Sequence, residues 1–342
     1  MKATIFKHHG GPEVLEYTEA PEPTINANEV LVGVHACALN HLDVWARGGL
    51  PGIEIPLPHI LGNDIAGVVR EVGELVSWVK PGDEVMVQPG VSCGHCAECL
   101  SGRDNFCREY DIIGYRRDGG YAELVAVPDV NIIPKPANLS WAEAAALPLV
   151  TVTAWHMLVT RAQVQPGEAV LVHAAGSGVG SIGIQVAKLL GARVIATAGS
   201  DEKLLKAKEL GADEVINYTR DDWPKEVKRL TGRQGVDVVF EHTGAQTWGG
   251  SIASLKAGGR LVTCGATSGF DARTDLRQLF YRHLTILGSF MGSKAELLEA
   301  MKFVEKGKIR AVVDQVLPLS EARRAHELME NRAQFGKLVL QP

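Results

Sequence analysis

The second half of the chain alternates short β-rich runs with helical runs, and this alternation restricts the possible folds more than any other sequence feature. The predicted strands are residues 169–173, 193–198, 214–217, 236–241, 260–264 and 285–287. The predicted helices between them are residues 178–190, 203–210, 223–230 and 248–255. A helix between two strands returns the chain to the edge where the first strand began, so successive strands run parallel. The pattern predicts an α/β fold with a doubly wound, six-stranded parallel sheet.

A glycine-rich turn follows the first of these strands. It comprises Ala175, Gly176, Ser177, Gly178, Val179 and Gly180. Glycines allow a tight turn and a close approach of the backbone to a pyrophosphate, and free N–H groups at a helix start favour an anion. Ser181 stands where a third glycine is usual, and a glycine-rich loop without a ligand is the alternative. The strand, turn and helix in succession favour dinucleotide binding.

The end of the second strand bears on the choice of nucleotide. Folds that select NAD place a carboxylate there, about 20 residues after the glycines, to bind the ribose 2′-OH. Here the strand ends in Ala198, and Asp201 follows only at the expected start of a helix. Lys203, Tyr218 and Arg220 are candidates to hold a 2′-phosphate instead. The sequence therefore favours NADP(H) over NAD(H), unless these are ordinary solvated side chains.

Residues 1 to about 135 are predicted to form an irregular, mainly β domain, because short β-rich runs are punctuated by Gly and Pro. The expected strands include residues 29–34, 65–72, 84–87 and 121–127. Helical runs at 141–146 and 151–160 follow. A tail with a helix at 294–307 and mixed signals at 315–340 is expected to pack on this first domain.

Charge and hydropathy disfavour two classes of partner. The chain has 35 Lys and Arg against 40 Asp and Glu, a net charge of -5, so it has no general attraction for nucleic acid or anionic lipid. No run reaches the roughly 18 uninterrupted apolar residues of a membrane span. The first residues also lack the apolar region of a secretory signal. We expect a cytoplasmic protein that acts on a small molecule.

Four of the six cysteines gather within 15 residues, at Cys93, Cys96, Cys99 and Cys107. Without a secretory signal, this clustering favours metal ligation over disulfides. Four thiolates complete a tetrahedral coordination sphere, so the site is predicted to be structural rather than catalytic, and His95 is surplus to it. One zinc ion per chain is expected. Iron and a redox-active thiol cluster are the alternatives.

Together these motifs resemble those of the medium-chain dehydrogenase/reductase superfamily, which contains the zinc alcohol dehydrogenases and their quinone oxidoreductase relatives. The resemblance rests on residues 62–68 (GNDIAGV), Gly73, 81–85 (PGDEV), the four cysteines, 119–123 (GGYAE) and the turn 175–180. It implies a GroES-like, mainly β catalytic domain of residues 1–150 and 291–342, with a metal lobe at about 90–110. It also implies a Rossmann dinucleotide-binding domain of residues 151–290.

The chain differs from the zinc alcohol dehydrogenases at the positions of the catalytic zinc ligands. The positions of the zinc ligands in that family carry Asn40, Asn63 and a residue near Leu149 in this chain. An amide is a poor zinc ligand and an aliphatic side chain is none. The residues at these positions resemble those of the zinc-independent quinone oxidoreductase and enoyl reductase branch of the superfamily. Proteins of that branch, however, generally lack the four-cysteine lobe. A displaced metal site is an alternative, and its candidate ligands are His41, Asp43, His59 and Asp64.

Without a Lewis acid, hydride transfer at a nicotinamide relies on hydrogen-bond donors placed where charge develops on the substrate. This favours a small carbonyl, quinone or activated alkene as substrate. The resemblance implies catalytic roles for Asn40, His41, Asn63 and Thr153. The remaining cofactor contacts that it implies are Ser200, Gly265, Ala266, Ser289 and Lys337.

Two other functions are compatible with the same motifs. The first is an NAD(P)-dependent alcohol dehydrogenase with an atypical or absent catalytic metal. The second is a nucleotide-binding protein, nucleotide-sensing or RNA-associated, that has lost turnover. Turnover with a panel of substrates separates the second from both enzymes.

The run at residues 285–290 (TILGSF) predicts an apolar strand at the sheet edge. In the resembling enzymes such an edge pairs with a second subunit, and an uncovered apolar edge is a liability in a monomer. A homodimer or homotetramer is expected.

Overall fold

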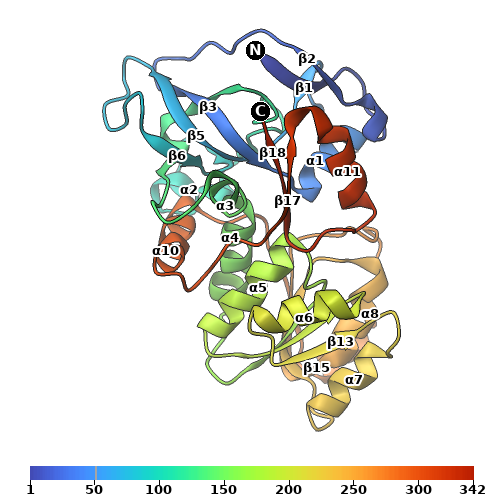
Figure 1. The fold of residues 1–342 in the computed structure, drawn as a ribbon. Coiled ribbons are helices and arrows are strands. Elements are labelled where there is room, and N and C mark those ends of the chain that lie inside the picture. The colour runs from blue at the N-terminus through green and yellow to red at the C-terminus, as the bar shows by residue number, and fades with distance from the viewer. Residues whose placement is uncertain (51) are drawn as a thin grey trace. The chain divides into compact units, whose positions relative to one another are not determined.

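The computed structural model describes residues 1–50 and 52–342, and its contacts divide the chain into two compact units. Unit 1 comprises Met1–Leu149, Ser293–Ala295 and Ala311–Pro342, and unit 2 comprises Val150–Gly292 and Glu296–Arg310. Both chain ends therefore belong to unit 1 (Figure 1). The chain passes from one unit to the other four times: within α4 (Pro148–Trp155), just before α10 (Lys294–Glu305), within α10, and after residue 310.

Unit 1 is mainly β, as predicted. Its largest sheet has the order β10-β6-β5-β3-β18-β17, and β9 also pairs with β3. Its strands are β3 (Glu29–Ala38), β5 (Asp64–Val72), β6 (Glu84–Val87), β9 (Leu124–Pro128), β10 (Ile132–Pro134), β17 (Val313–Pro318) and β18 (Lys337–Gln341). Two smaller sheets contain β1 (Lys2–Phe6), β2 (Glu16–Glu19) and β4 (His59–Ile60), and β7 (Gly90–Val91) and β8 (Asp111–Ile112). The helices of this unit are α1 (His41–Gly48), α2 (Ala97–Leu100), α3 (Trp141–Ala145) and α11 (Ala322–Glu330).

Several expectations for the first domain differ from the structure, among them β3, which ends at Ala38 rather than at residue 34. Strand β9 begins at Leu124 rather than at 121, because the N–H groups of Gly120 and Tyr121 bond to the Gly62 and Leu61 carbonyls, 2.8 and 2.9 Å away, outside the large sheet. Residues 150, 291–292 and 296–310, expected in the first domain, belong to unit 2. There His156 Nδ1 contacts Glu296 Oε1 of α10 at 2.8 Å. The later tail belongs to unit 1, where β18 pairs with β3.

Unit 2 contains the predicted six-stranded parallel sheet, with the order β13-β12-β11-β14-β15-β16. Its strands are β11 (Ala169–Val172), β12 (Arg193–Ala198), β13 (Glu214–Asn217), β14 (Val236–Glu241), β15 (Leu255–Thr263) and β16 (Thr285–Gly288). Chain order runs outward from β11 in both directions, so the switch point lies between β11 and β14. Strand β15 begins five residues earlier than 260, because Leu255 pairs with Val236 before a register shift.

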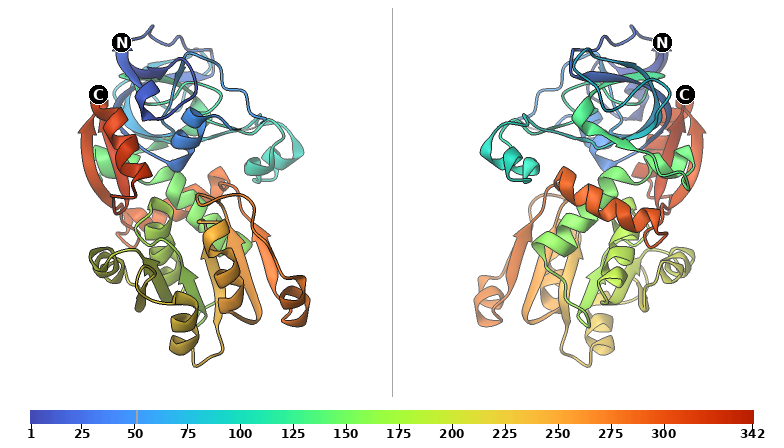
Figure 2. Two further views of the ribbon diagram at one scale, coloured as in Figure 1. Left: turned by 90° about the vertical axis from the view of Figure 1, so that its right-hand side faces the viewer. Right: turned by 90° about the vertical axis from the view of Figure 1, so that its left-hand side faces the viewer.

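The helices of unit 2 follow the strands in alternation and enclose an apolar core. They are α5 (Gly178–Leu189), α6 (Asp201–Glu209), α7 (Trp223–Leu230), α8 (Ala245–Ser254) and α9 (Leu276–Tyr281), and a π-helical stretch (His156–Arg161) continues α4. Right-handed crossovers from a central switch point place α5 and α6 on one face of the sheet and α7 and α8 on the other (Figure 2). In the described part of the chain, no helix is both long and apolar enough to cross a membrane.

Candidate active site and metal centre

The glycine-rich turn in unit 2 is built as a helix start. The Ser177 hydroxyl accepts the Gly180 N–H at 2.8 Å and caps α5, which leaves the N–H groups of Gly178 and Val179 without intrahelical acceptors. A Cβ at Gly180 would lie 2.4 Å from the Ala174 carbonyl oxygen, so this position requires glycine. The turn thus presents backbone donors at the positive end of a helix.

Other predicted cofactor residues follow the carboxyl ends of neighbouring parallel strands. Gly265 and Ala266 come after β15, and Ser289 after β16, where its N–H bonds to the Thr263 carbonyl at 2.8 Å. A Cβ at Gly244, which follows β14, would lie 2.8 Å from Cα of Ala266, so these two loops are in close contact. Dinucleotides bind at this edge of an open parallel sheet, at the switch point. The structure brings these loops and the glycine-rich turn to one edge.

The residues after β12 are more strongly paired than the sequence indicated. Ser200 caps α6, with its hydroxyl 3.3 Å from the Lys203 N–H. Arg220 forms ion pairs with Asp201 at 3.2 Å and Asp221 at 3.3 Å, and its charge is therefore offset by two carboxylates. The Tyr218 hydroxyl lies against Gly199, where a Cβ would be 2.8 Å from it. Arg220 is accordingly less available to a 2′-phosphate than the sequence indicated.

Sequence reasoning missed a buried polar cluster beneath this edge. Glu241 ends β14 and is fully buried, and its carboxylate accepts the Ser251 hydroxyl at 2.6 Å, the Thr247 hydroxyl at 2.9 Å and the Thr243 N–H at 2.7 Å. Because Ser251 donates to Glu241, it accepts from His173 Nε2, 2.9 Å away. Burial lowers the pKa of His173 to about 4, so the imidazole is neutral. The cluster fixes the loop after β14, and the only sequence signal for it was a Glu inside an apolar strand.

In unit 1, Asn40 and Asn63 meet in one buried hydrogen-bond network. The Asn40 Nδ2 donates to Asn63 Oδ1 and to Asp64 Oδ2, each at 2.7 Å. The Leu149 N–H donates to the other Asp64 oxygen at 2.8 Å. Lys337 Nζ donates to Asn40 Oδ1 at 2.6 Å and to Asp64 Oδ2 at 3.0 Å. The three positions expected to carry zinc ligands thus surround Asp64, and an ammonium group is the cation beside them.

Asp43, on α1, also belongs to this network, as an acceptor for Asn40 and Asn63. It accepts the Asn40 N–H at 2.7 Å, the Gly62 N–H at 3.2 Å and the Asn63 side-chain N–H at 3.1 Å. The Tyr121 hydroxyl lies 3.4 Å from its second oxygen. Burial raises the pKa of Asp43 to about 6, although these donors and the Lys337 charge oppose the shift. Asp43 therefore orients the Asn63 amide, whose Nδ2 faces this carboxylate.

A second chain of donors reaches Asp43 from α11. Arg47 pairs with Glu330 and donates to His326 Nδ1 at 2.9 Å, so the His326 proton is on Nε2. That nitrogen lies 3.2 Å from the Tyr121 hydroxyl. Burial and the Arg47 charge lower the pKa of His326 to about 3. The folded protein therefore keeps this imidazole neutral at any moderate pH.

The His326 contact predicts a pH-dependent stability. The unfolded chain binds a proton at histidine below about pH 6.5 but the folded chain does not, so the wild type should lose up to about 3 kcal/mol between pH 6.5 and 4 through this group. In His326→Gln an amide replaces the imidazole and does not titrate, and this part of the pH dependence should vanish. Denaturant unfolding at pH 7, 5.5 and 4 measures it. Equal slopes for the two proteins would contradict the prediction.

The other predicted catalytic residues have local contacts of their own. His41 begins α1 and its ring meets Trp45 edge-on, with centroids 5.2 Å apart. His59, a candidate for a displaced metal site, pairs with Asp118 at 3.2 Å. Thr153 lies on α4 in unit 2 and is 5% exposed, and its role at a nicotinamide stays a prediction.

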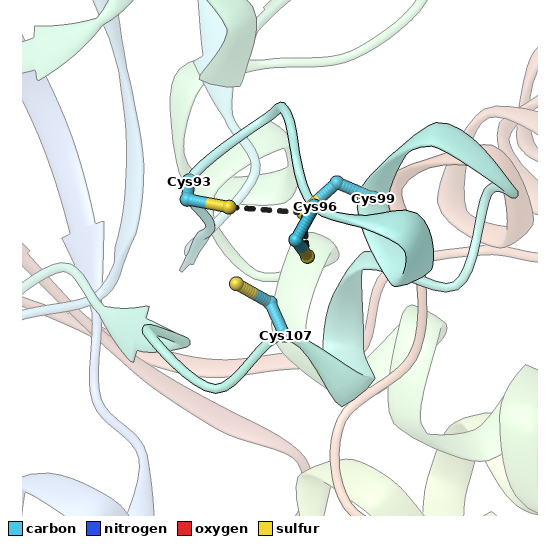
Figure 3. Close-up of side chains that lie close together, drawn as sticks. All are labelled: Cys93, Cys96, Cys99 and Cys107. Atoms are coloured by element: carbon cyan, nitrogen blue, oxygen red, sulfur yellow. Dashed lines mark hydrogen bonds between the residues drawn. The ribbon is translucent and has the colours of Figure 1, made fainter.

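The four cysteines form a compact thiol cluster (Figure 3). One sulfur from each lies within 4.8 Å of the others, and Cys99 Sγ is 3.5 Å from Cys96 Sγ and 3.9 Å from Cys93 Sγ. Cys96 directly precedes α2, and backbone N–H groups of His95 and Cys96 lower the pKa of Cys93 to about 6. His95 Nδ1 contacts the Cys93 carbonyl oxygen at 2.8 Å. These four soft donors fit a closed tetrahedral metal site.

No other group of three or more His, Cys, Asp or Glu side chains converges in this way within residues 1–50 and 52–342. Around Asp64, amides and an aliphatic side chain stand in place of zinc ligands, and this donor set does not fit a catalytic zinc ion.

Comparison with known proteins identifies the family. Residues 26–137 match the alcohol dehydrogenase GroES-like domain, and residues 178–306 match the zinc-binding dehydrogenase family. The chain is 34% identical to an alcohol dehydrogenase of Geobacillus stearothermophilus over 99% of both chains. It is 33% identical to a crotonyl-CoA reductase of Streptomyces avermitilis, over 95% of this chain and 82% of that one. A crystal structure described as an NAD-dependent alcohol dehydrogenase is 54% identical over the whole of both chains, with a TM-score of 0.97. The chain therefore belongs to the medium-chain dehydrogenase/reductase superfamily, as its motifs predicted, and is an oxidoreductase.

Proposed function

We propose that the protein transfers hydride between a nicotinamide cofactor, preferentially NADP(H), and a small carbonyl compound, quinone or activated alkene, without a catalytic zinc ion. The observation that carries this proposal is the network of Asn40, Asn63 and Asp64, in which amides occupy the positions of zinc ligands. A simple alcohol must lose a proton as well as a hydride, and a metal is the usual means of lowering its pKa. The reduction of a polarised double bond does not require an alcohol to lose its proton, and so it does not require a metal for that step.

The residues of this chain would bind the nucleotide, orient the substrate and hold the structural metal ion. The turn 175–180 and the loops after β14, β15 and β16 would bind the nucleotide through backbone donors at the sheet edge. The bound nicotinamide would supply or accept the hydride. Asn40 and Asn63, with His41 and Thr153, would orient the substrate and the ring. The four cysteines would hold one structural zinc ion and stabilise their lobe.

A substrate panel tests the proposal. Purified protein is assayed with NADPH and with NADH against quinones, enals, enoyl thioesters and aldehydes, and in the reverse direction with alcohols. We expect oxidation of NADPH with at least one class of activated double bond. Tight nucleotide binding without turnover in any assay would favour the non-catalytic alternative.

An alcohol dehydrogenase is the second candidate, because the 54% identical solved structure carries that description. Metal analysis separates the two. One zinc ion per chain, and turnover that survives a chelator while the cysteine site stays filled, are expected for the proposed reductase. Two metal ions per chain, or complete inhibition with the cysteine site still filled, would favour the alcohol dehydrogenase.

The nucleotide preference can be reversed at the end of β12. In Ala198→Asp, a carboxylate would accept the ribose 2′-OH and repel a 2′-phosphate, and we expect the ratio of kcat/KM for NADPH to that for NADH to fall by about tenfold or more. Asp201 is already paired with Asn217 and Arg220, and Asp201→Asn therefore serves as the control that removes a nearby charge. An unchanged ratio in Ala198→Asp would locate selectivity elsewhere. A wild type that strongly prefers NADH would contradict the proposed preference directly.

Strand β16 ends the parallel sheet, and its outer edge has no strand partner within residues 1–50 and 52–342. We propose that this edge pairs with a second copy of the chain in a homodimer or homotetramer. Light scattering of the wild type, with Ile286→Pro as an edge-disrupting variant, tests it.

A further inference from the structure

We propose that the Lys337 ammonium group replaces a metal ion as the cation that organises the Asn40, Asn63 and Asp64 site. Lys337 is then a positioning residue for hydride transfer. The sequence had suggested a different role for it, as a ligand of the nucleotide. The catalytic part of this inference rests on the proposed function.

The backbone brings Lys337 to this site from the far end of the chain. Lys337 is the first residue of β18, and β18 pairs antiparallel with the end of β3 through Val339 opposite Ala38. The Leu39 N–H bonds to the Leu338 carbonyl at 2.9 Å, which extends the pairing to the residue before Asn40. The Lys337 side chain is 3% exposed, so its charge is almost entirely removed from bulk water. Such a buried ammonium group persists only where acceptors hold it.

The ammonium group determines which way the Asn40 amide points. An ammonium group can only donate, so the Asn40 atom 2.6 Å from Nζ must be the oxygen. Both Nδ2 hydrogens are then directed to Asn63 Oδ1 and Asp64 Oδ2. Because Asn63 Oδ1 accepts, the Asn63 Nδ2 faces Asp43. One obligate donor at Lys337 thus fixes two amides in sequence, ending on the Asp43 carboxylate.

Lys337 also balances the charge of Asp64. The Asp64 carboxylate is fully buried, and an unpaired carboxylate at such a place is strongly unfavourable. It receives N–H donors from Asn40 and Leu149, and the only full positive charge within hydrogen-bond distance among the described residues is the Lys337 ammonium, 3.0 Å away. A dication among zinc ligands would perform both tasks, orienting the ligands and neutralising the acid. Here one side chain performs them.

The experiment separates orientation from charge balance. Lys337→Met removes both, the double variant Asp64→Asn/Lys337→Met removes the acid together with its cation, and Lys337→Arg keeps an obligate donor. Lys80→Met, at an exposed lysine of unit 1, is the control. The readouts are melting temperature, nucleotide Kd from fluorescence, and kcat at saturating nucleotide and substrate.

We expect Lys337→Met to lower both melting temperature and kcat, the latter by about 30-fold or more, with nucleotide Kd within about threefold of wild type. The double variant should regain the melting temperature but not kcat, because Asn40 still lacks its donor. Lys337→Arg should regain part of kcat. Recovery of kcat in the double variant would mean that Lys337 is only structural, and a weakened nucleotide Kd with unchanged kcat would mean that it binds the nucleotide. Either result overturns the inference.

A second measurement needs no turnover and keeps the inference distinct from the proposed function. Hydrogen exchange at the Asn40 side-chain amide, followed by NMR of protein labelled at asparagine, should be about tenfold faster or more in Lys337→Met than in wild type. Equal exchange rates would overturn the inference even if the enzyme is active. If no substrate in the panel turns over but exchange responds as expected, the proposed function fails while the organising role of Lys337 stands.

Discussion

Cys96→Ser is expected to lose its bound metal and a large part of its stability, with little direct effect on chemistry. The four sulfur atoms lie within 4.8 Å of one another, and four thiolates leave no open position for a substrate. Structural zinc contributes on the order of 10 kcal/mol to folding in small domains that are unfolded without it. The loss here should be several kcal/mol, because the sheets of unit 1 support the rest of the domain. Metal content per chain and melting temperature measure it.

Two controls sharpen this result. Cys264→Ser removes a thiol outside the cluster, and His95→Ala removes an imidazole whose Nδ1 contacts the Cys93 carbonyl oxygen. Both proteins should keep one metal ion per chain. A well-folded Cys96→Ser protein with an unchanged melting temperature and no turnover would contradict a structural role.

Asn40→Ala is expected to lower kcat by about 100-fold at saturating nucleotide. The change removes the acceptor of Lys337 and both donors to Asn63 and Asp64, so the remaining groups lose their fixed geometry. Displacements near 1 Å can reduce a rate by this much. Single-turnover oxidation of NADPH measures hydride transfer without interference from product release.

The matched control is Asn138→Ala, at an exposed asparagine of the same unit. It should leave both kcat and the melting temperature unchanged. Asn40→Ala also removes part of a buried network, and its melting temperature is therefore measured beside kcat. Full activity of a folded Asn40→Ala protein would show that this network does not position the reacting groups.

The β/α alternation of unit 2 could be predicted closely from the sequence. Strands β12, β13 and β14 and helix α7 have the predicted boundaries, because apolar β-rich runs and capping residues act over a few neighbouring positions. The glycine-rich turn and the four-cysteine segment are local in the same sense. Their spacing along the chain already restricts the geometry that they adopt.

The contacts that build the buried networks of unit 1 are not local. The Lys337 side chain meets Asn40 across 297 residues, and no periodicity links the two. His326 reaches Tyr121 across 205 residues by the same kind of packing. From the sequence alone, a lysine near the chain end is expected to be a surface cation or a phosphate ligand. Lys337 is buried because β18 pairs with β3.

The sequence by itself therefore determined the family, the parallel sheet and the clustering of four cysteines, since each depends on residue type at short spacing. Only the tertiary structure decided which side chains surround Asn40, Asn63 and Asp64. Burial makes an unpaired charge or amide costly, so Asp64 and Asn40 require partners, but which side chains supply them depends on strand pairing between distant segments. The same reason explains the Glu241 cluster, whose partners come from separate elements of unit 2.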